Sequence, residues 1–206
     1  MIRVFVADDH AIVRDGLERL LHIEPDFEFA GSSASAKETL TLAATSSWDV
    51  LVLDLSLPGG GGFYVLEHLP TVRPDLPVVV FTMHNEYEFA QRVLSAGAFA
   101  CLSKTRPIDE LIAAVREAHA GRRTVTSEAA QALLASPDGA PHTRLTDREL
   151  QVFMLLASGM RPSDVAAKLG LSKQTVSTHA RRIRDKLAVE SQAEMARYAM
   201  RHGLLE

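Results

Sequence analysis

The first 120 residues alternate between short apolar runs and stretches in which apolar residues recur at helical spacing. Near-continuous apolar runs are typical of strands buried on both faces, and here they span residues 3–7, 28–30, 50–53, 78–81 and 98–102. Helical spacing runs from Val13 until Pro25 interrupts it, and returns over residues 36–45, 63–69, 86–96 and 108–118. This alternation predicts an α/β fold, a doubly wound five-stranded parallel sheet with helices on both faces.

The last third of the chain carries helix-start signals instead. Residues 146–149 form a capping box, Pro162 suits the first position of a second helix, and Ser172 is placed to cap a third. A fourth helix is predicted from Ser191 to Gly203. A glycine-bearing turn joins the second and third helices, which is typical of a helix-turn-helix. We therefore predict a second, smaller all-α domain of four helices.

A run of turn-forming residues, 136–143, separates the two patterns. Just before it, residues 127–135 have the pattern of a short connecting helix. We therefore predict a first domain over residues 1–120, a linker with a short helix over 121–142, and a helix-turn-helix domain over 143–206.

The composition is that of an ordinary globular protein, with 47% hydrophobic and 23% charged residues among 206. It excludes a disordered chain and a disulfide framework, because the lone Cys101 has no internal partner. No apolar run approaches the roughly 18 residues that span a bilayer. Acidic residues follow the first strand too early for a signal peptide. We expect a cytoplasmic protein that does not associate with membranes.

Charge is divided unevenly between the two halves. Residues 1–120 hold 9 Lys and Arg against 17 Asp and Glu, whereas residues 121–206 hold 13 against 9. Six of those bases lie between Lys168 and Leu187. Such asymmetry favours a first half that handles cations and a second half that contacts a polyanion, although two ordinary solvated faces would look the same.

Polar residues follow four of the predicted strands, at the points where the strands end. They are Asp8, Asp9, Asp54, Thr82 and Lys104. In a flavodoxin-like sheet with strand order 2-1-3-4-5, these side chains would meet at one edge, where ligands of such sheets bind. Singly, each has an ordinary explanation, because Asp favours loop starts and Lys favours surfaces.

The predicted edge has the charges of a phosphoryl-transfer site. Three carboxylates held close repel one another and call for a hard divalent cation, for which Mg²⁺ is the natural choice. One carboxylate can then attack a phosphoryl group while Lys104 and Thr82 hold its oxygens. The predicted product is an aspartyl phosphate.

The motifs of the first 120 residues resemble the receiver domain of two-component response regulators. The resemblance rests on Asp8-Asp9, on residues 54–59 with Gly62, on Thr82, and on Gly97-Ala98 leading to Lys104. It implies that Asp54 accepts a phosphoryl group from a phosphohistidine of a sensor histidine kinase. It also implies a Mg²⁺ site made by Asp8, Asp9, Asp54 and the main-chain carbonyl of Ser56, with Lys104 and Thr82 on the phosphoryl oxygens.

Some positions depart from that pattern or have a second interpretation. Leu57 stands where Met is common, which conserves volume. Cys101 stands where the family usually has Tyr or Phe, a ring thought to turn inward on activation, and we favour a buried inert thiol over a redox role. The glycines 59–62 lack the spacing of a P-loop and indicate a mobile loop beside Asp54.

The third helix of the second half has two distinct faces. On a helical wheel, Val176, Ala180, Ile183 and Leu187 face the core. Hydrogen-bonding and cationic side chains occupy the rest, as a recognition helix in the major groove requires; a solvated helix that docks on the first half is the alternative. The candidate DNA-binding residues are Lys173, Gln174, Ser177, Thr178, Arg181, Arg182, Arg184 and Lys186.

This half is similar to the LuxR-type DNA-binding domain, over residues 143–206. The matching motifs are 145–149, 157–159, 165–169, 172–179 and 186–187. With a receiver in front, the whole chain resembles a NarL/FixJ-family response regulator. The resemblance implies base contacts chiefly at Ser177, Thr178 and Arg181, and pairing of the C-terminal helix, about residues 192–202, on double-stranded DNA. We expect a homodimer on a two-fold site when the protein is phosphorylated or DNA-bound.

The combined hypothesis is a transcription regulator, not an enzyme, controlled by Mg²⁺-dependent phosphotransfer to Asp54. One alternative is a phosphorylation-independent regulator whose receiver is a protein-interaction module, with Cys101 as the clue. Another is a hydrolase of phosphate esters, but Ser56 stands where such an enzyme needs an acid two residues after Asp54.

Overall fold

A computed structural model describes residues 1–84, 86–134, 141–202 and 204–205. The chain divides into two compact units, Met1–Leu133 and Leu134–Glu206. Each unit is described by itself below. The predicted domain bounds at residues 120 and 143 stay predictions, since the division into units follows spatial contacts.

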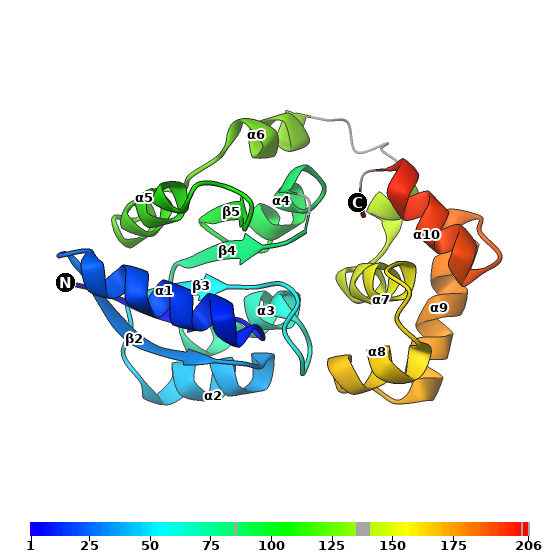
Figure 1. Ribbon diagram of the computed structural model, residues 1–206, viewed down its shortest axis with the longest axis horizontal. Coiled ribbons are helices and arrows are strands. Elements are labelled where there is room, and N and C mark those ends of the chain that lie inside the picture. The colour runs from blue at the N-terminus through cyan, green and yellow to red at the C-terminus, as the bar shows by residue number, and fades with distance from the viewer. Residues whose placement is uncertain (85, 135–140, 203, 206) are drawn as a thin grey trace. The chain divides into compact units, whose positions relative to one another are not determined.

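The first unit is built on a parallel sheet with the strand order β2-β1-β3-β4-β5, which confirms the predicted order (Figure 1). Strand β2 is longer than predicted because Gly31, Ser32 and Ser33 pair with β1, although no apolar run marks them. An edge strand pairs on one side only and tolerates polar residues. The strands are β1 (Ile2–Ala7), β2 (Phe27–Ser33), β3 (Val50–Leu53), β4 (Val78–Thr82) and β5 (Ala100–Ser103).

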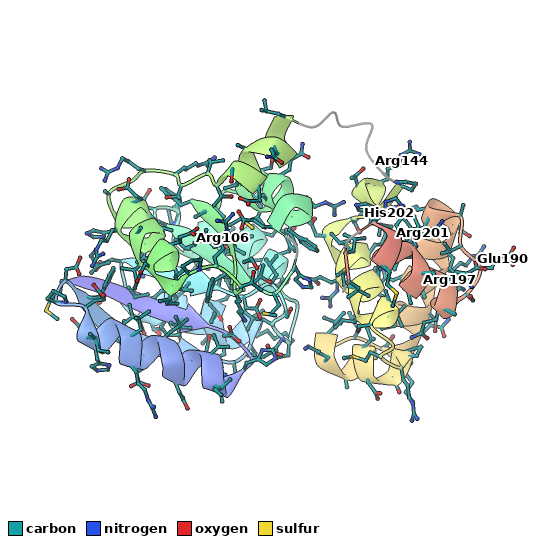
Figure 2. The ribbon with its side chains drawn as sticks, turned by 45° about the horizontal axis from the view of Figure 1, so that its top comes forward. Arg106, Arg144, Glu190, Arg197, Arg201 and His202 are labelled. Carbon is teal, nitrogen blue, oxygen red and sulfur yellow. The ribbon has the colours of Figure 1, made fainter. Side chains whose placement is uncertain are left out.

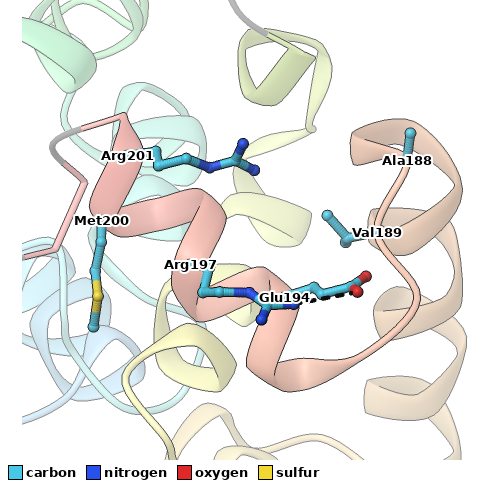
Figure 3. Close-up of a pocket in the computed structure, with 6 residues that line it drawn as sticks. All are labelled: Ala188, Val189, Glu194, Arg197, Met200 and Arg201. Carbon is cyan, nitrogen blue, oxygen red and sulfur yellow. Dashed lines mark hydrogen bonds and ion pairs between the residues drawn. The ribbon is translucent and has the colours of Figure 1, made fainter.

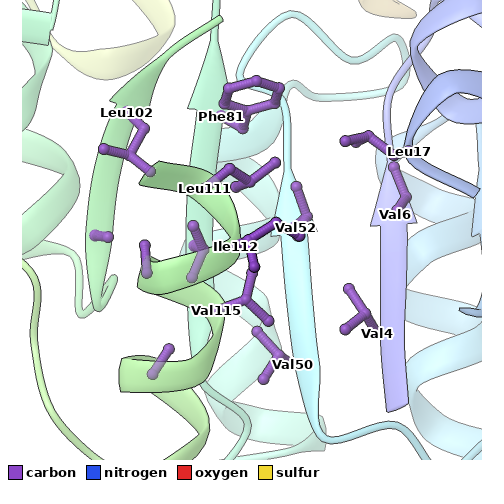
Figure 4. Packing of buried hydrophobic residues seen from close by; sticks show 14 of the residues in the cluster. Val4, Val6, Leu17, Val50, Val52, Phe81, Leu102, Leu111, Ile112 and Val115 are labelled. Atoms are coloured by element: carbon purple, nitrogen blue, oxygen red, sulfur yellow. The ribbon is translucent and has the colours of Figure 1, made fainter. Parts of the chain in front are cut away.

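Helices cover both faces of this sheet, as predicted (Figure 1). Helices α1 (Ala11–Ile23) and α5 (Ile108–His119) pack on one face through a core of alternate strand residues. Figure 4 shows Val4, Val6 and Val52 of the strands with Ile112 and Val115 of α5 in that core. The other face carries α2 (Ala36–Thr45), α3 (Gly62–Val72) and α4 (Glu86–Ser95).

The short helix predicted before the linker is α6 (Ser127–Leu134), and residue 135 lies outside the described residues. Buried Glu86, at the start of α4, joins this helix to the first unit. Its carboxylate accepts hydrogen bonds from the hydroxyl of Thr126 and, at 2.7 Å, from Nε of Arg106. Arg106, labelled in Figure 2, also pairs with Glu128 of α6. Helix α6 is thus tied to the first unit by a partly buried ion cluster.

The second unit contains the four predicted helices: α7 (Asp147–Ala157), α8 (Pro162–Leu169), α9 (Lys173–Leu187) and α10 (Gln192–Arg201). The Thr146 capping box, Pro162 at the first turn of α8 and the Ser172 cap of α9 are confirmed. An additional 3₁₀ turn, η1 (Pro141–Arg144), spans the predicted boundary between the linker and the second domain. Residues 135–140 of the predicted linker, and the predicted helix end Gly203, lie outside the described residues.

Candidate functional site

Two carboxylates lie side by side where the central strands of the first unit end. Ala7 of β1 pairs with Leu53 of β3, and the Asp54 amide donates to the Ala7 carbonyl at 2.8 Å. The next residues, Asp8 and Asp54, are therefore neighbours at the same sheet edge. Each is only 2% exposed. Burial of two like charges is costly, so the site requires positive charge close by.

Lys104 supplies part of that charge. Its Nζ lies 2.6 Å from Oδ2 of Asp8 and 3.1 Å from Oδ2 of Asp54, and its side chain is only 6% exposed. The chain brings Lys104 there from the end of β5, where its amide donates to the carbonyl of Thr82 at 2.7 Å. Thr82 is fully buried at the end of β4. The predicted strand-end residues thus meet at one edge.

The acidic cluster, Asp8, Asp9 and Asp54, still lacks positive charge. Oδ1 of Asp54 is buried and has no hydrogen-bond partner among the described residues. Asp8, Asp9, Asp54 and His10 each offer one ligand atom, and these four atoms lie within 4.8 Å of one another. A carboxylate-rich site with an unsatisfied buried oxygen fits a divalent cation, and Mg²⁺ prefers such oxygen donors. The residues present therefore fit the predicted metal.

Two histidines beside the cluster were not among the predicted site residues. Nδ1 of His10 lies 2.9 Å from Oδ1 of Asp9. His84 donates its amide to the Thr82 hydroxyl at 3.3 Å, and its Nε2 lies 3.2 Å from the hydroxyl of Ser56. His10 could have been suspected from its place after the aspartate pair. No signal in the sequence indicates that His84 lies between Ser56 and Thr82.

The glycine run after Asp54 has a steric function. Gly59, Gly60 and Gly61 adopt positive φ angles of 80°, 136° and 85°, a region that favours glycine. Gly62 has no such angle, but a Cβ atom there would lie 2.5 Å from the carbonyl oxygen of Asp54. The run therefore allows the chain to turn tightly against the backbone of Asp54. The predicted mobility of this loop stays a prediction.

Cys101 lies inside β5 and is 1% exposed. Burial, with a further contribution from the negative charge of Glu86, raises the pKa of its thiol to about 12. Thiols react as thiolates, so this environment favours an inert packing residue over a redox sensor.

The recognition-helix prediction matches the burial of α9. Val176, Ala180, Ile183 and Leu187 are buried, as predicted. Of the candidate DNA-binding residues, Arg184 is half-buried, and the exposed ones are Lys173, Gln174, Ser177, Thr178, Arg181, Arg182 and Lys186. Their roles stay predictions, but seven of the eight lie on the accessible surface of the unit.

Lys186 has a structural contact within the same unit. Its Nζ donates to the Glu149 carboxylate at 2.5 Å and to the Arg144 carbonyl at 3.2 Å. Burial of Glu149 opposes ionisation, but hydrogen bonds from Lys186 and Thr146 outweigh it and lower the pKa of the carboxyl. Lys186 therefore joins α9 to α7 and to η1, a function that its place on the helical wheel did not indicate.

His179 fits packing better than metal binding. Burial, and then the positive charge of Arg148, lower the pKa of its imidazole. In the part of the chain that the structure describes, the group of residues suited to a metal is the one around Asp54. Within the same described ranges, no helix has both the length and the apolar character needed to cross a membrane.

Comparison with known proteins identifies both units. The profile of the response regulator receiver domain matches residues 4–116, and that of the bacterial regulatory proteins of the luxR family matches residues 143–199. Response regulator GacA of Pseudomonas aeruginosa is 33% identical over all of this chain and 99% of its own.

Two solved structures of RcsB are also similar to this chain. RcsB from Salmonella enterica serovar Typhimurium, bound to promoter rprA in the presence of the phosphomimetic BeF3⁻, is 26% identical with a TM-score of 0.71, covering 96% of this chain and 97% of that one. A structure of two RcsB dimers bound to two parallel DNAs is 25% identical with a TM-score of 0.61, covering 97% and 98%.

The close approach of Gly62 to Asp54 predicts a destabilised variant. We expect Gly62→Ala to lower the free energy of unfolding of the first unit by about 1–3 kcal/mol, because the new methyl group overlaps a backbone oxygen. Urea unfolding followed by fluorescence of Trp48, the single tryptophan, measures it. The matched control is Gly16→Ala in α1, where an added Cβ atom would meet nothing within 4 Å beyond its chain neighbours and the nearby helix backbone, and a gain of up to about 1 kcal/mol is expected. Equal effects of the two substitutions would contradict the steric argument.

The raised pKa of Cys101 predicts slow alkylation of the folded protein. The unfolded thiol ionises near its ordinary pKa of 9.0, whereas the folded thiol stays neutral until the pH approaches about 12. Between pH 7 and 9 we expect iodoacetamide to modify the folded chain at least about a hundredfold more slowly than the chain in urea. Mass spectrometry of quenched samples gives both rates. Similar rates in the two states would show that the thiol is accessible and ionised.

Proposed function

The chain belongs to the NarL/FixJ-family two-component response regulators, which join a receiver domain to a LuxR-type DNA-binding domain, and we propose that phosphorylation of Asp54 controls its binding to DNA. The observation that carries this proposal is the buried, unpartnered Oδ1 of Asp54 beside the Lys104 ammonium. Among the described residues no hydrogen bond occupies this oxygen, and with a dication bound the site would attract a dianionic phosphoryl group.

The proposed donor is a phosphohistidine of a sensor histidine kinase. One carboxylate oxygen of Asp54 attacks the phosphorus while the other stays available to a cation; a P–O bond forms, and the P–N bond breaks with its electron pair on the imidazole nitrogen, which takes a proton from water. Lys104 and the Thr82 hydroxyl hold the phosphoryl oxygens. Asp8, Asp9, Asp54 and the carbonyl of Ser56 would hold Mg²⁺, which when bound neutralises charge on the transferring group.

The proposed DNA contacts are made by the exposed face of α9. Ser177, Thr178 and Arg181 present hydrogen-bonding groups toward base edges in the major groove. Lys173 and Arg182 flank them and are placed for phosphates. The RcsB complexes with DNA support this assignment by similarity.

We propose that the second unit dimerises on DNA through α10, with a second copy of this chain as the partner. A groove beside α10 is lined by Ala188, Val189, Glu194, Arg197, Met200 and Arg201 (Figure 3; Arg197 and Arg201 also in Figure 2). Met200 is 59% exposed, and the lining of the same groove includes the charged residues Glu194, Arg197 and Arg201. A patch that is apolar with both signs of charge can be complementary to itself across a two-fold axis. The RcsB dimers bound to DNA support dimerisation on DNA by similarity.

Phosphorylation control predicts a response that depends on Asp54. With beryllofluoride and Mg²⁺, we expect the wild-type chain to form dimers and to bind DNA at least about tenfold more tightly, since the phosphoryl mimic shifts the receiver between two states. Asp54→Asn should show neither change. Light scattering gives the mass, and fluorescence anisotropy at one stated salt concentration gives the affinity for a duplex selected by the wild-type protein from a random pool. A response of equal size in Asp54→Asn would instead support the phosphorylation-independent regulator.

Separate base and phosphate contacts predict two kinds of DNA-binding variant. Arg181→Ala should weaken binding to the selected duplex by about 1–3 kcal/mol. It should also reduce the ratio of the affinity for the selected duplex to that for a scrambled duplex. Lys173→Ala should weaken binding to both duplexes about equally and reduce the slope of log affinity against log salt by about 1. Arg122→Ala, in the first unit, is the control for a surface charge outside α9. If Arg181→Ala leaves the ratio of the two affinities unchanged, Arg181 does not read sequence.

A further inference from the structure

His10 is held against the acidic cluster by both its backbone and its side chain. It is the residue before α1, and its side chain makes no capping hydrogen bond to that helix. Its amide donates to Oδ1 of Asp8 at 2.9 Å, which fixes the backbone beside the site. Its ring Nδ1 lies 2.9 Å from Oδ1 of Asp9 and 3.3 Å from Oδ1 of Asp8. The ring therefore faces the carboxylates.

The ammonium group of Lys104 contacts different carboxylate oxygens from those that His10 contacts. Its Nζ contacts Oδ2 of Asp8 and Oδ2 of Asp54. His10 lies against Oδ1 of Asp8 and Oδ1 of Asp9, and Oδ1 of Asp54 is buried without a hydrogen-bond partner among the described residues. The group of four ligand atoms within 4.8 Å of one another consists of one from each aspartate and one from His10. This set is three oxygens and one imidazole nitrogen.

The three aspartates alone fit Mg²⁺, whereas the addition of His10 gives a donor set that also suits transition metals. Mg²⁺ binds oxygen ligands and gains little from imidazole, whereas Co²⁺, Ni²⁺ and Zn²⁺ bind nitrogen well and generally bind a site with nitrogen and oxygen ligands more tightly than Mn²⁺ does. We propose that His10 is a ligand, through Nδ1, for a divalent transition metal at this site. The proposal rests on the proposed metal site of Asp8, Asp9 and Asp54 and adds a ligand and a metal class to it.

Ligation requires the tautomer of His10 that carries its proton on Nε2, so that the lone pair of Nδ1 points at the metal. The side chain of His10 is 55% exposed, so its Nε2 can donate a hydrogen bond to water. The competing interpretation is that Nδ1 carries the proton and only orients the Asp9 carboxylate, as residues behind a metal ligand commonly do. The two interpretations predict different affinities for Mg²⁺ when His10 is replaced. An orienting hydrogen bond raises the affinity of the site for every metal, whereas a nitrogen ligand raises it for transition metals.

The test compares Co²⁺ with Mg²⁺ in the full-length wild-type chain and in His10→Asn. Asparagine keeps a side-chain donor for Asp9 and removes the imidazole. Isothermal titration measures Co²⁺ binding, and amide NMR shifts measure Mg²⁺ binding. His22→Asn is the matched control, because His22 lies in α1, the helix that His10 precedes, with its Nδ1 2.7 Å from the Glu18 carbonyl oxygen. NMR of the Co²⁺-bound chain adds a direct readout, because a coordinated imidazole gives a strongly shifted, exchangeable Nε2 proton.

We expect His10→Asn to lower the affinity for Co²⁺ by about tenfold or more, to change that for Mg²⁺ less than about twofold, and to abolish the shifted proton. His22→Asn should change none of these. Equal losses for both metals would overturn the proposal and leave His10 as a positioning residue. Unchanged Co²⁺ affinity, or the absence of the shifted proton in wild type, would also overturn it while the aspartate site stands. If neither metal binds the wild-type chain, the proposed metal site itself is wrong.

Discussion

Repulsion between buried carboxylates is the constraint around which the first unit is organised. Asp8 and Asp54 are adjacent because β1 and β3 are paired. The strand register fixes the two backbones side by side, so a change of side-chain rotamer alone cannot move the two carboxylates far apart. Lys104 reaches both, and it can do so because β4 and β5 continue the same parallel sheet. The sheet thus brings the negatively charged carboxylates together, and the single positive charge of Lys104 only partly balances them. A dication and a phosphoryl group are the complementary ligands for such an edge.

The second unit separates stability from recognition on one helix. The buried stripe of α9 packs on its neighbours, and Lys186 adds an ion pair with Glu149. Most of the remaining cations stay on the exposed face, so the unit can be stable without DNA and still present its charge. Since removal of one partner of a buried pair leaves an uncompensated charge, loss of Lys186 would affect folding as well as any phosphate contact.

Periodicity and strand-end chemistry predicted the features that follow from local rules. The strand order, the caps at Thr146 and Ser172, the buried stripe of α9 and the meeting of Asp8, Asp54 and Lys104 are of this kind. Features set by side-chain direction between distant segments were not predictable. The contacts of His84 with Ser56 and Thr82 and the ties of Arg106 to Glu86 and Glu128 join residues far apart in sequence, and no spacing rule encodes them.

Cys101 shows how packing limits the ways in which the receiver can respond to Asp54. In relatives an aromatic ring at this position is thought to move, but here β5 holds a small thiol that is shielded from solvent and pairs in register with Val80. The side chain of Thr82, at the end of the adjacent strand, remains a path for coupling. Its hydroxyl accepts from the His84 amide, and the His84 ring is stacked on Phe89 of α4 with ring centroids 4.7 Å apart. A shift of Thr82 toward a phosphoryl group would therefore act directly on the segment that leads into α4, without the aromatic ring.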